Sequence, residues 1–119
     1  MDFENEKPIF VQIAEGIEDA IVTGAFPEES RIPSITEFSV MYKINPATAL
    51  KGINILVESG IVYKKRGVGM FVSEGAKKKL SDKRKSAFFE NYVRKMLVEA
   101  GRLGIKKEEI IDMLKEENE

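Results

Sequence analysis

The sequence has 119 residues, of which 43% are hydrophobic and 33% are charged, as expected for a globular chain with one domain or one domain plus an appendage. It contains no cysteine and no histidine, which excludes disulfides, cysteine zinc sites and a histidine general base. The formal net charge is −1, but residues 1–75 carry 7 basic and 11 acidic side chains, so a nucleic-acid role for them requires the basic side chains to gather on one face.

A first helix is predicted after Pro8. Proline is favoured in the first turn of a helix, where its missing N–H needs no partner. Apolar residues then recur at spacings of three and four, which places them on one face. These residues are Ile9, Ile13, Ile17, Ala20 and Ile21. Gly24 and the Phe26-Pro27 pair mark the end of this helix.

Arg31-Ile32-Pro33-Ser34 is predicted to be an extended approach to a second helix. Pro33 disfavours helical geometry in the residue before it. Ser34 followed by Glu37 matches the capping-box pattern, in which each side chain binds the other residue's backbone N–H. The helix that begins there is short and is expected to end near Lys43.

A third helix is predicted from Asn45 to about Gly60. Asn45 is a favoured N-cap, and Pro46 is favoured at the first helical position. The residues expected to face inward are Ala49, Ile53, Leu56 and Val57. Two capped helices separated by such a tight turn are typical of a helix-turn-helix.

A β-hairpin is predicted after Gly60, where the hydrophobic period changes. Residues 61–64 form the first strand, Lys65-Arg66-Gly67-Val68-Gly69 the turn and residues 70–72 the returning strand. A two-stranded hairpin is marginally stable alone, so we expect it to pack on the helices as a wing. The predicted fold class is mainly α (α+β), a winged helix-turn-helix with a two-helix C-terminal dimerisation arm.

Helical periodicity returns at about Ala76, which predicts two domains, 1–75 and 76–119. One long apolar stripe follows, formed by Leu80, Phe88, Tyr92, Met96, Ala100 and Leu103. It has only one further helix to pack on, that of Ile105, Ile110, Ile111 and Leu114. An exposed apolar face of this size is typical of an interface, although it is also compatible with a ligand pocket. The residues predicted to form a dimer interface are Leu80, Phe88, Phe89, Tyr92, Val93, Met96 and Leu97.

The order and spacing of these motifs resemble those of the GntR family of bacterial transcription regulators. The resemblance covers residues 8–73 and is carried by Pro8-Ile9-Phe10-Val11-Gln12-Ile13, Arg31-Ile32-Pro33-Ser34, Asn45-Pro46-Ala47-Thr48, Gly60 and the wing of residues 65–72. The short helical remainder resembles the YtrA subfamily, in which two C-terminal helices mainly dimerise the protein. The resemblance implies a sequence-specific regulator, a homodimeric repressor that binds a palindromic operator of double-stranded DNA.

The sequence also departs from this family at three places. Thr36 stands where family members commonly carry an arginine. Residues 28–30, Glu-Glu-Ser, fill a turn that usually contains a glycine, and Met70 replaces a common threonine.

The candidate DNA contacts lie at the two helix starts and in the wing. A helix N-terminus offers backbone N–H groups to a phosphate, and small or polar side chains on its first turns reach base edges. In the wing, Lys64 precedes two further basic residues, and the glycines permit close backbone approach. The predicted contacts are Ser34, Thr36, Asn45, Ala47, Thr48, Lys51, Lys65, Arg66, Gly67 and Gly69. Ser34 and Asn45 are also satisfied simply as helix caps.

Other interpretations remain open at this point. Lys77-Lys78-Lys79 and Lys83-Arg84-Lys85 form either a second nucleic-acid patch or a solvated helix start. The whole chain is alternatively a winged-helix protein–protein module, and a carboxylate enzyme is disfavoured by the missing histidine and cysteine. We expect no enzymatic activity, no cofactor and no metal, and a cytoplasmic, non-membrane location. The sequence does not identify a small-molecule effector.

Overall fold

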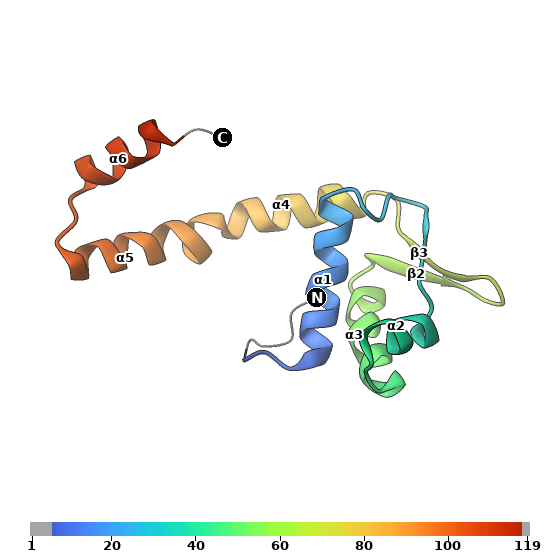
Figure 1. Cartoon of the computed structure of the whole chain (residues 1–119). Coiled ribbons are helices and arrows are strands. Elements are labelled where there is room, and N and C mark those ends of the chain that lie inside the picture. The colour runs from blue at the N-terminus through green and yellow to red at the C-terminus, as the bar shows by residue number, and fades with distance from the viewer. Residues whose placement is uncertain (1–5, 118–119) are drawn as a thin grey trace. The chain divides into compact units, whose positions relative to one another are not determined.

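The computed structural model describes residues 6–117 (Figure 1). In chain order the elements are α1 (Ile9–Val22), β1 (Arg31–Ile32), α2 (Ile35–Tyr42), α3 (Pro46–Glu58), β2 (Val62–Lys65), β3 (Gly69–Val72), α4 (Ala76–Phe88), η1 (Phe89–Val93), α5 (Arg94–Leu103) and α6 (Lys107–Glu116). The chain divides into two compact units, Met1–Ser81 and Asp82–Glu119. The predicted fold class, mainly helical with a small antiparallel sheet in a winged helix-turn-helix, is confirmed.

The core of the first unit lies where α1 packs on α3. The predicted stripe of α1 is buried there through Ile13, Ile17 and Ile21, opposite buried residues of α3. Gly52 permits the close approach of the two helices, because a Cβ at this position would lie 2.6 Å from the carbonyl oxygen of Phe10. Of the predicted inward residues of α3, Ala49, Ile53 and Leu56 are buried and Val57 packs against the core.

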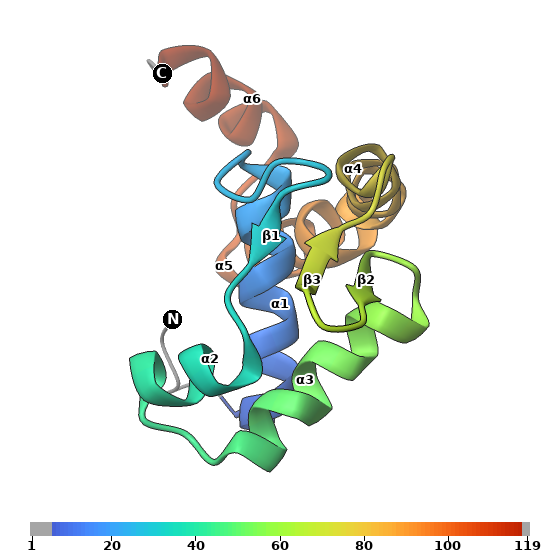
Figure 2. The ribbon, with the colours of Figure 1, turned by 90° about the vertical axis from the view of Figure 1, so that its right-hand side faces the viewer.

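The wing is a three-stranded antiparallel sheet and not the predicted hairpin alone. Figure 2 shows β3 between β1 and β2. In β1, Arg31 pairs with Phe71 and Ile32 pairs with Met70. The extended conformation of Arg31 and Ile32 was predictable from Pro33, but their partner lies about forty residues later in the chain and leaves no local signal.

Two glutamates of the loop between α1 and β1 hold distant segments together. The carboxylate of Glu28 accepts hydrogen bonds from the backbone N–H of Gly75 (2.7 Å) and of Lys77 (3.2 Å), at the start of α4. Glu29 accepts a 2.7 Å hydrogen bond from the hydroxyl of Tyr63, which raises the pKa of that phenol. Glu29 has a φ of +66°, so a residue other than glycine adopts the left-handed geometry in this turn.

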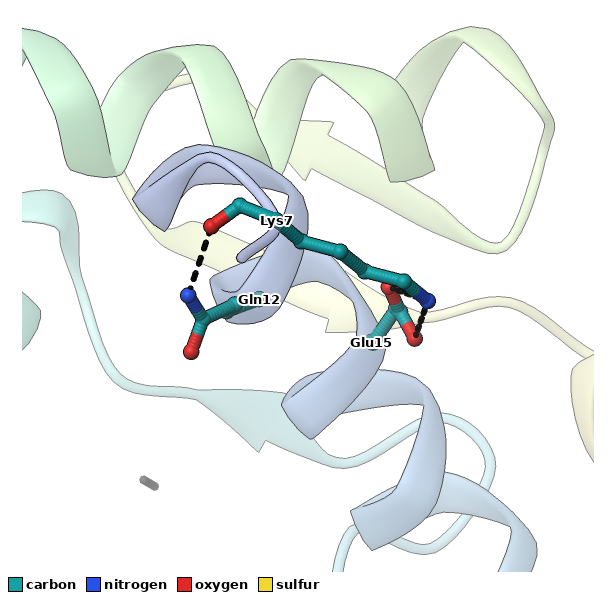
Figure 3. Close-up of polar contacts among 3 residues, drawn as sticks. All are labelled: Lys7, Gln12 and Glu15. Atoms are coloured by element: carbon teal, nitrogen blue, oxygen red, sulfur yellow. Dashed lines mark hydrogen bonds and ion pairs between the residues drawn. The ribbon is translucent and has the colours of Figure 1, made fainter. Parts of the chain in front are cut away.

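The chain enters α1 through side-chain contacts that Figure 3 shows. The buried side chain of Gln12 donates from Nε2 to the backbone carbonyl of Lys7, at 2.7 Å. The ammonium of Lys7 reaches the carboxylate of Glu15, 2.8 Å away. These contacts fix Lys7 against the first turns of the helix.

The two compact units divide within α4, after Ser81, and the predicted domain boundary after residue 75 stays a prediction. Ala76 and Leu80 are 1% and 3% exposed and belong to the core of the first unit. The assignment of Leu80 to a dimer interface is therefore corrected, because its side chain is already enclosed. Periodicity identifies an apolar face but does not say what covers it.

The second unit contains a π-helical turn, η1, that was not predicted. Its defining hydrogen bond runs from the N–H of Arg94 to the carbonyl of Phe89. Cζ of Arg94 also lies over the ring of Phe89, 5.0 Å from its centroid. Because a turn of an α-helix has 3.6 residues, each apolar residue is rotated about the helix axis by about 40° relative to the one four positions earlier. The wider π turn opposes this rotation between Phe88 and Met96.

Glu28 is expected to stabilise the first unit through its two hydrogen bonds to the start of α4. Replacing it with alanine leaves these N–H groups without their partner, so Glu28→Ala should lower the free energy of unfolding by about 1 kcal/mol. Urea denaturation measures this loss. Glu74→Ala, which removes a carboxylate beside the same helix start, is the control, and an equal loss in both variants would show that charge alone is responsible.

Candidate nucleic-acid interface

A groove of about 450 Å³ lies in the first unit between the start of α2 and the wing. It is lined by Arg31, Ile32, Ser34, Ile35, Thr36, Lys64, Lys65, Arg66, Gly67, Val68, Gly69 and Met70. Four of these residues are basic and none is acidic. The groove thus gathers four of the seven basic side chains of residues 1–75, a segment with a net charge of −4.

Ser34, the N-cap residue of the predicted capping box, lies in one wall of this groove. The hydroxyl oxygen of Ser34 accepts a hydrogen bond from the N–H of Glu37, and the N–H of Ser34 donates to the carboxylate of Glu37, both at 3.1 Å. The hydrogen bonds from the backbone and the hydroxyl of Ser34 lower the pKa of Glu37, and the charge of Arg31 adds to this effect. Because the amide of Ser34 is engaged, an incoming phosphate would use the next helix-start amides, those of Ile35 and Thr36.

The tip of the wing forms the opposite wall. Lys65 pairs with Gly69 at the end of the hairpin, and the N–H of Val68 closes the turn on the carbonyl of Lys65, at 2.9 Å. Gly67 and Gly69 have φ values of +76° and +147°, which side chains rarely allow. Arg66 lies exposed in this turn. The predicted wing residues are therefore together at one exposed tip.

Arg31 is a groove residue that the sequence analysis did not identify. A Cβ placed on Gly69 would lie 2.7 Å from Nε of Arg31, so the guanidinium side chain crosses the wing at the point where a glycine leaves room. The placement depends on the pairing of β1 with β3. The sequence shows that Arg31 directly precedes the Ile-Pro-Ser motif, but it does not show with which strand this residue pairs.

Two wing lysines make contacts that orient their side chains. The ammonium of Lys65 lies 5.2 Å from the ring centroid of Phe71. The ammonium of Lys64 lies 3.5 Å from Oδ1 of Asn54, on α3. Asn54 was also missed by the sequence analysis, since an isolated asparagine inside a helix carries no motif.

The predicted contacts at the start of α3 form a separate group outside the lining of the groove. Asn45 caps the helix as predicted, with Oδ1 accepting from the N–H of Ala47 at 2.8 Å. Asn45 and Ala47 are exposed and Thr48 is half-buried. The exposed Lys51 reaches across to α1, where its ammonium lies 4.1 Å from the ring centroid of Phe10. Such a cation–π contact contributes about 0.5–1 kcal/mol at exposed sites, a weak restraint that a phosphate can displace.

The second unit exposes most of its apolar side chains. Phe88, Phe89, Tyr92 and Met96 are 54%, 46%, 67% and 40% exposed, whereas Val93 and Leu97 are half-buried. Only Ala100 and Ile110 are buried among the described residues of this unit. An apolar pocket of about 290 Å³ between α5 and α6 extends the face; it is lined by Met96, Glu99, Ala100, Leu103, Ile105, Ile110, Met113 and Leu114.

Residues 6–117 contain no helix long and apolar enough to cross a membrane. Within the same span, no group of three acidic residues is placed to hold a metal ion.

Comparisons with known proteins agree with this geometry. Residues 10–72 match the family model described as bacterial regulatory proteins, gntR family. YhcF of Bacillus subtilis, an uncharacterized HTH-type transcriptional regulator, is 32% identical over 95% of this chain and 92% of its own. YtrA of the same organism, an HTH-type transcriptional repressor, is 26% identical over 98% of this chain and 88% of its own. The structure of a GntR family transcriptional regulator from Listeria monocytogenes has a TM-score of 0.79 and 30% identity, covering 98% of this chain and 100% of its own.

The contact between Gly69 and Arg31 predicts unequal effects for two wing glycines. Gly69→Ala should lower the free energy of unfolding by about 2 kcal/mol, because its Cβ meets Nε of Arg31 and its backbone is strained. Gly67→Ala, whose Cβ meets nothing within 4 Å, should cost only about 1 kcal/mol. Urea denaturation compares the two. When Arg31→Ala is combined with Gly69→Ala, the part of the loss that is due to the clash with Nε of Arg31 should disappear. Equal losses in both glycine variants would contradict the contact.

Proposed function

Because the chain belongs to the GntR family of bacterial regulatory proteins, it is a DNA-binding transcription regulator, and we propose that it acts as a homodimeric repressor at a palindromic operator. The observation that supports this most strongly is the basic groove between the start of α2 and the wing, inside the family-matched residues. It offers cations and helix-start amides to the sugar–phosphate backbone, while α3 offers small and polar side chains to base edges.

Each predicted residue has a place in this proposal. Ser34 and Thr36 hold a phosphate at the start of α2, and Lys65, Arg66, Gly67 and Gly69 approach the backbone or the minor groove from the wing. Arg31 joins them from β1. Asn45, Ala47, Thr48 and Lys51 face the major groove from the first turns of α3.

The dimer is proposed from the apolar surface of the second unit. Only two described residues of this unit are buried as apolar core. A dimer that covers the remaining apolar side chains therefore buries more apolar surface than the unit buries alone. These side chains are Phe88, Phe89, Tyr92, Val93, Met96 and Leu97. A twofold dimer places two copies of α3 about 34 Å apart, one turn of DNA, which matches two half-sites of a palindrome. We propose that the protein works in the cytoplasm and has no enzymatic activity.

One prediction of this proposal concerns the positive charge of the groove. Arg31→Ala and Arg66→Ala should each weaken binding to a mixed-sequence DNA duplex, because each removes a cation that releases counterions on binding. The slope of log affinity against log salt should fall by about one for each phosphate that is no longer neutralised, and so by about two per dimer. Fluorescence anisotropy over a range of salt concentrations measures both quantities.

Lys115→Ala, which removes a cation from the last turn of α6, is the matched control and should leave the slope unchanged. If all three variants bind like the original chain, the groove is not the DNA site. If the original chain binds the duplex with no salt dependence, the protein–protein interpretation is favoured.

Another prediction of this proposal concerns the dimer. Tyr92→Lys should convert the dimer to a monomer, because it places a charge in the apolar face, and affinity for a duplex carrying two half-sites should fall by about a hundredfold. Sedimentation equilibrium measures the oligomeric state. Asn91→Lys, which adds the same charge at the neighbouring exposed polar position, should remain dimeric. A Tyr92→Lys variant that stays dimeric would contradict this interface.

A further inference from the structure

The outward face of α3 is almost free of charge. From Pro46 to Val57 the helix contains one charged residue, Lys51. The side opposite the buried residues Ala49, Gly52, Ile53 and Leu56 carries Ala47, Thr48, Leu50, Lys51, Asn54 and Ile55, all exposed or half-buried. A DNA-reading helix of this composition has few ways to recognise a base pair.

The absence of arginine on this face disfavours guanine. Arginine or lysine paired with O6 and N7 of guanine is the commonest base-specific contact in the major groove. The single candidate here, Lys51, has its ammonium over the ring of Phe10 in α1, 4.1 Å from the centroid. Its reach toward a base competes with this contact.

The remaining side chains suit adenine and thymine. Asparagine forms paired hydrogen bonds with N6 and N7 of adenine, and small apolar groups contact the methyl group of thymine. Asn54 is positioned by Lys64 of the wing, whose ammonium lies 3.5 Å from its Oδ1. That oxygen keeps a second lone pair for adenine N6, and Nδ2 remains to donate to N7. Ala47 and Leu50 are exposed apolar groups on the same side of the helix.

The wing has a matching preference. Arg66 lies exposed in a turn with Gly67 and Gly69, where the backbone is free to approach a groove. Tracts of A·T pairs have a narrow minor groove whose negative potential attracts inserted arginine. Such a contact would involve a different element of the fold and a different groove of DNA.

We propose that α3 reads A·T base pairs, with Asn54 recognising an adenine and Ala47 and Leu50 contacting thymine methyl groups, so that the operator half-sites are A·T-rich where α3 enters the major groove. This inference rests on the proposed function of the same surface. It goes further by stating the class of sequence that the surface selects.

The test is selection of bound sequences from a random pool of double-stranded DNA at low salt, with the full chain and with Asn54→Ala. The full chain should enrich two half-sites with A·T pairs at their centres. Asn54→Ala should lose the preference at one A·T position per half-site and bind the selected duplex about tenfold more weakly. Its affinity for a mixed-sequence duplex should be unchanged, because backbone contacts carry no sequence information.

Asn91→Ala, an asparagine substitution in the second unit, is the matched control and should retain every preference. Enriched half-sites with G·C pairs at the positions under α3, or an Asn54→Ala profile identical to that of the original chain, would overturn the inference while leaving the proposed function intact. Failure of the folded chain to bind any duplex would overturn both.

Discussion

The pairing of two residues of β1 with β3 is the constraint on which the candidate interface depends. Arg31 and Ile32 form only a short strand, but their register with Phe71 and Met70 places the start of α2 directly beside the wing. The groove exists because these two parts meet, and without the pairing Ser34 and Arg66 would belong to separate surfaces. The buried side chain of Ile32, 1% exposed, ties the strand to the hydrophobic core and so keeps the register unique.

The charge distribution follows from the same arrangement. A segment with a net charge of −4 is a poor DNA ligand on average, yet no carboxylate lines the groove and four cations do. Glu28 and Glu29, in the loop before β1, accept structural hydrogen bonds. Glu28 accepts them from the start of α4, and Glu29 accepts one from Tyr63. These two acidic side chains thus stabilise the fold, while the four basic side chains of the groove give it a positive potential.

Local features were predictable from the sequence, and non-local ones were not. The caps at Ser34 and Asn45 were predicted correctly because each is completed within three residues. The strand β1 and the place of Arg31 were missed, since both depend on a partner distant in the chain. Leu80 was misassigned because an apolar period is the same whether a core or another molecule covers it. The π turn left only an indirect trace, the four-residue spacing from Phe88 to Met96.

The central claim is that the start of α2, α3 and the wing together form the surface that meets DNA. The most direct measurement is a titration of the ¹⁵N-labelled chain with a duplex that it binds, followed by the shifts of its backbone amide resonances. The account predicts that the changes concentrate on residues 34–36, 45–55 and 64–69. Changes confined to residues 82–117, or none at concentrations where the duplex is bound, would contradict it.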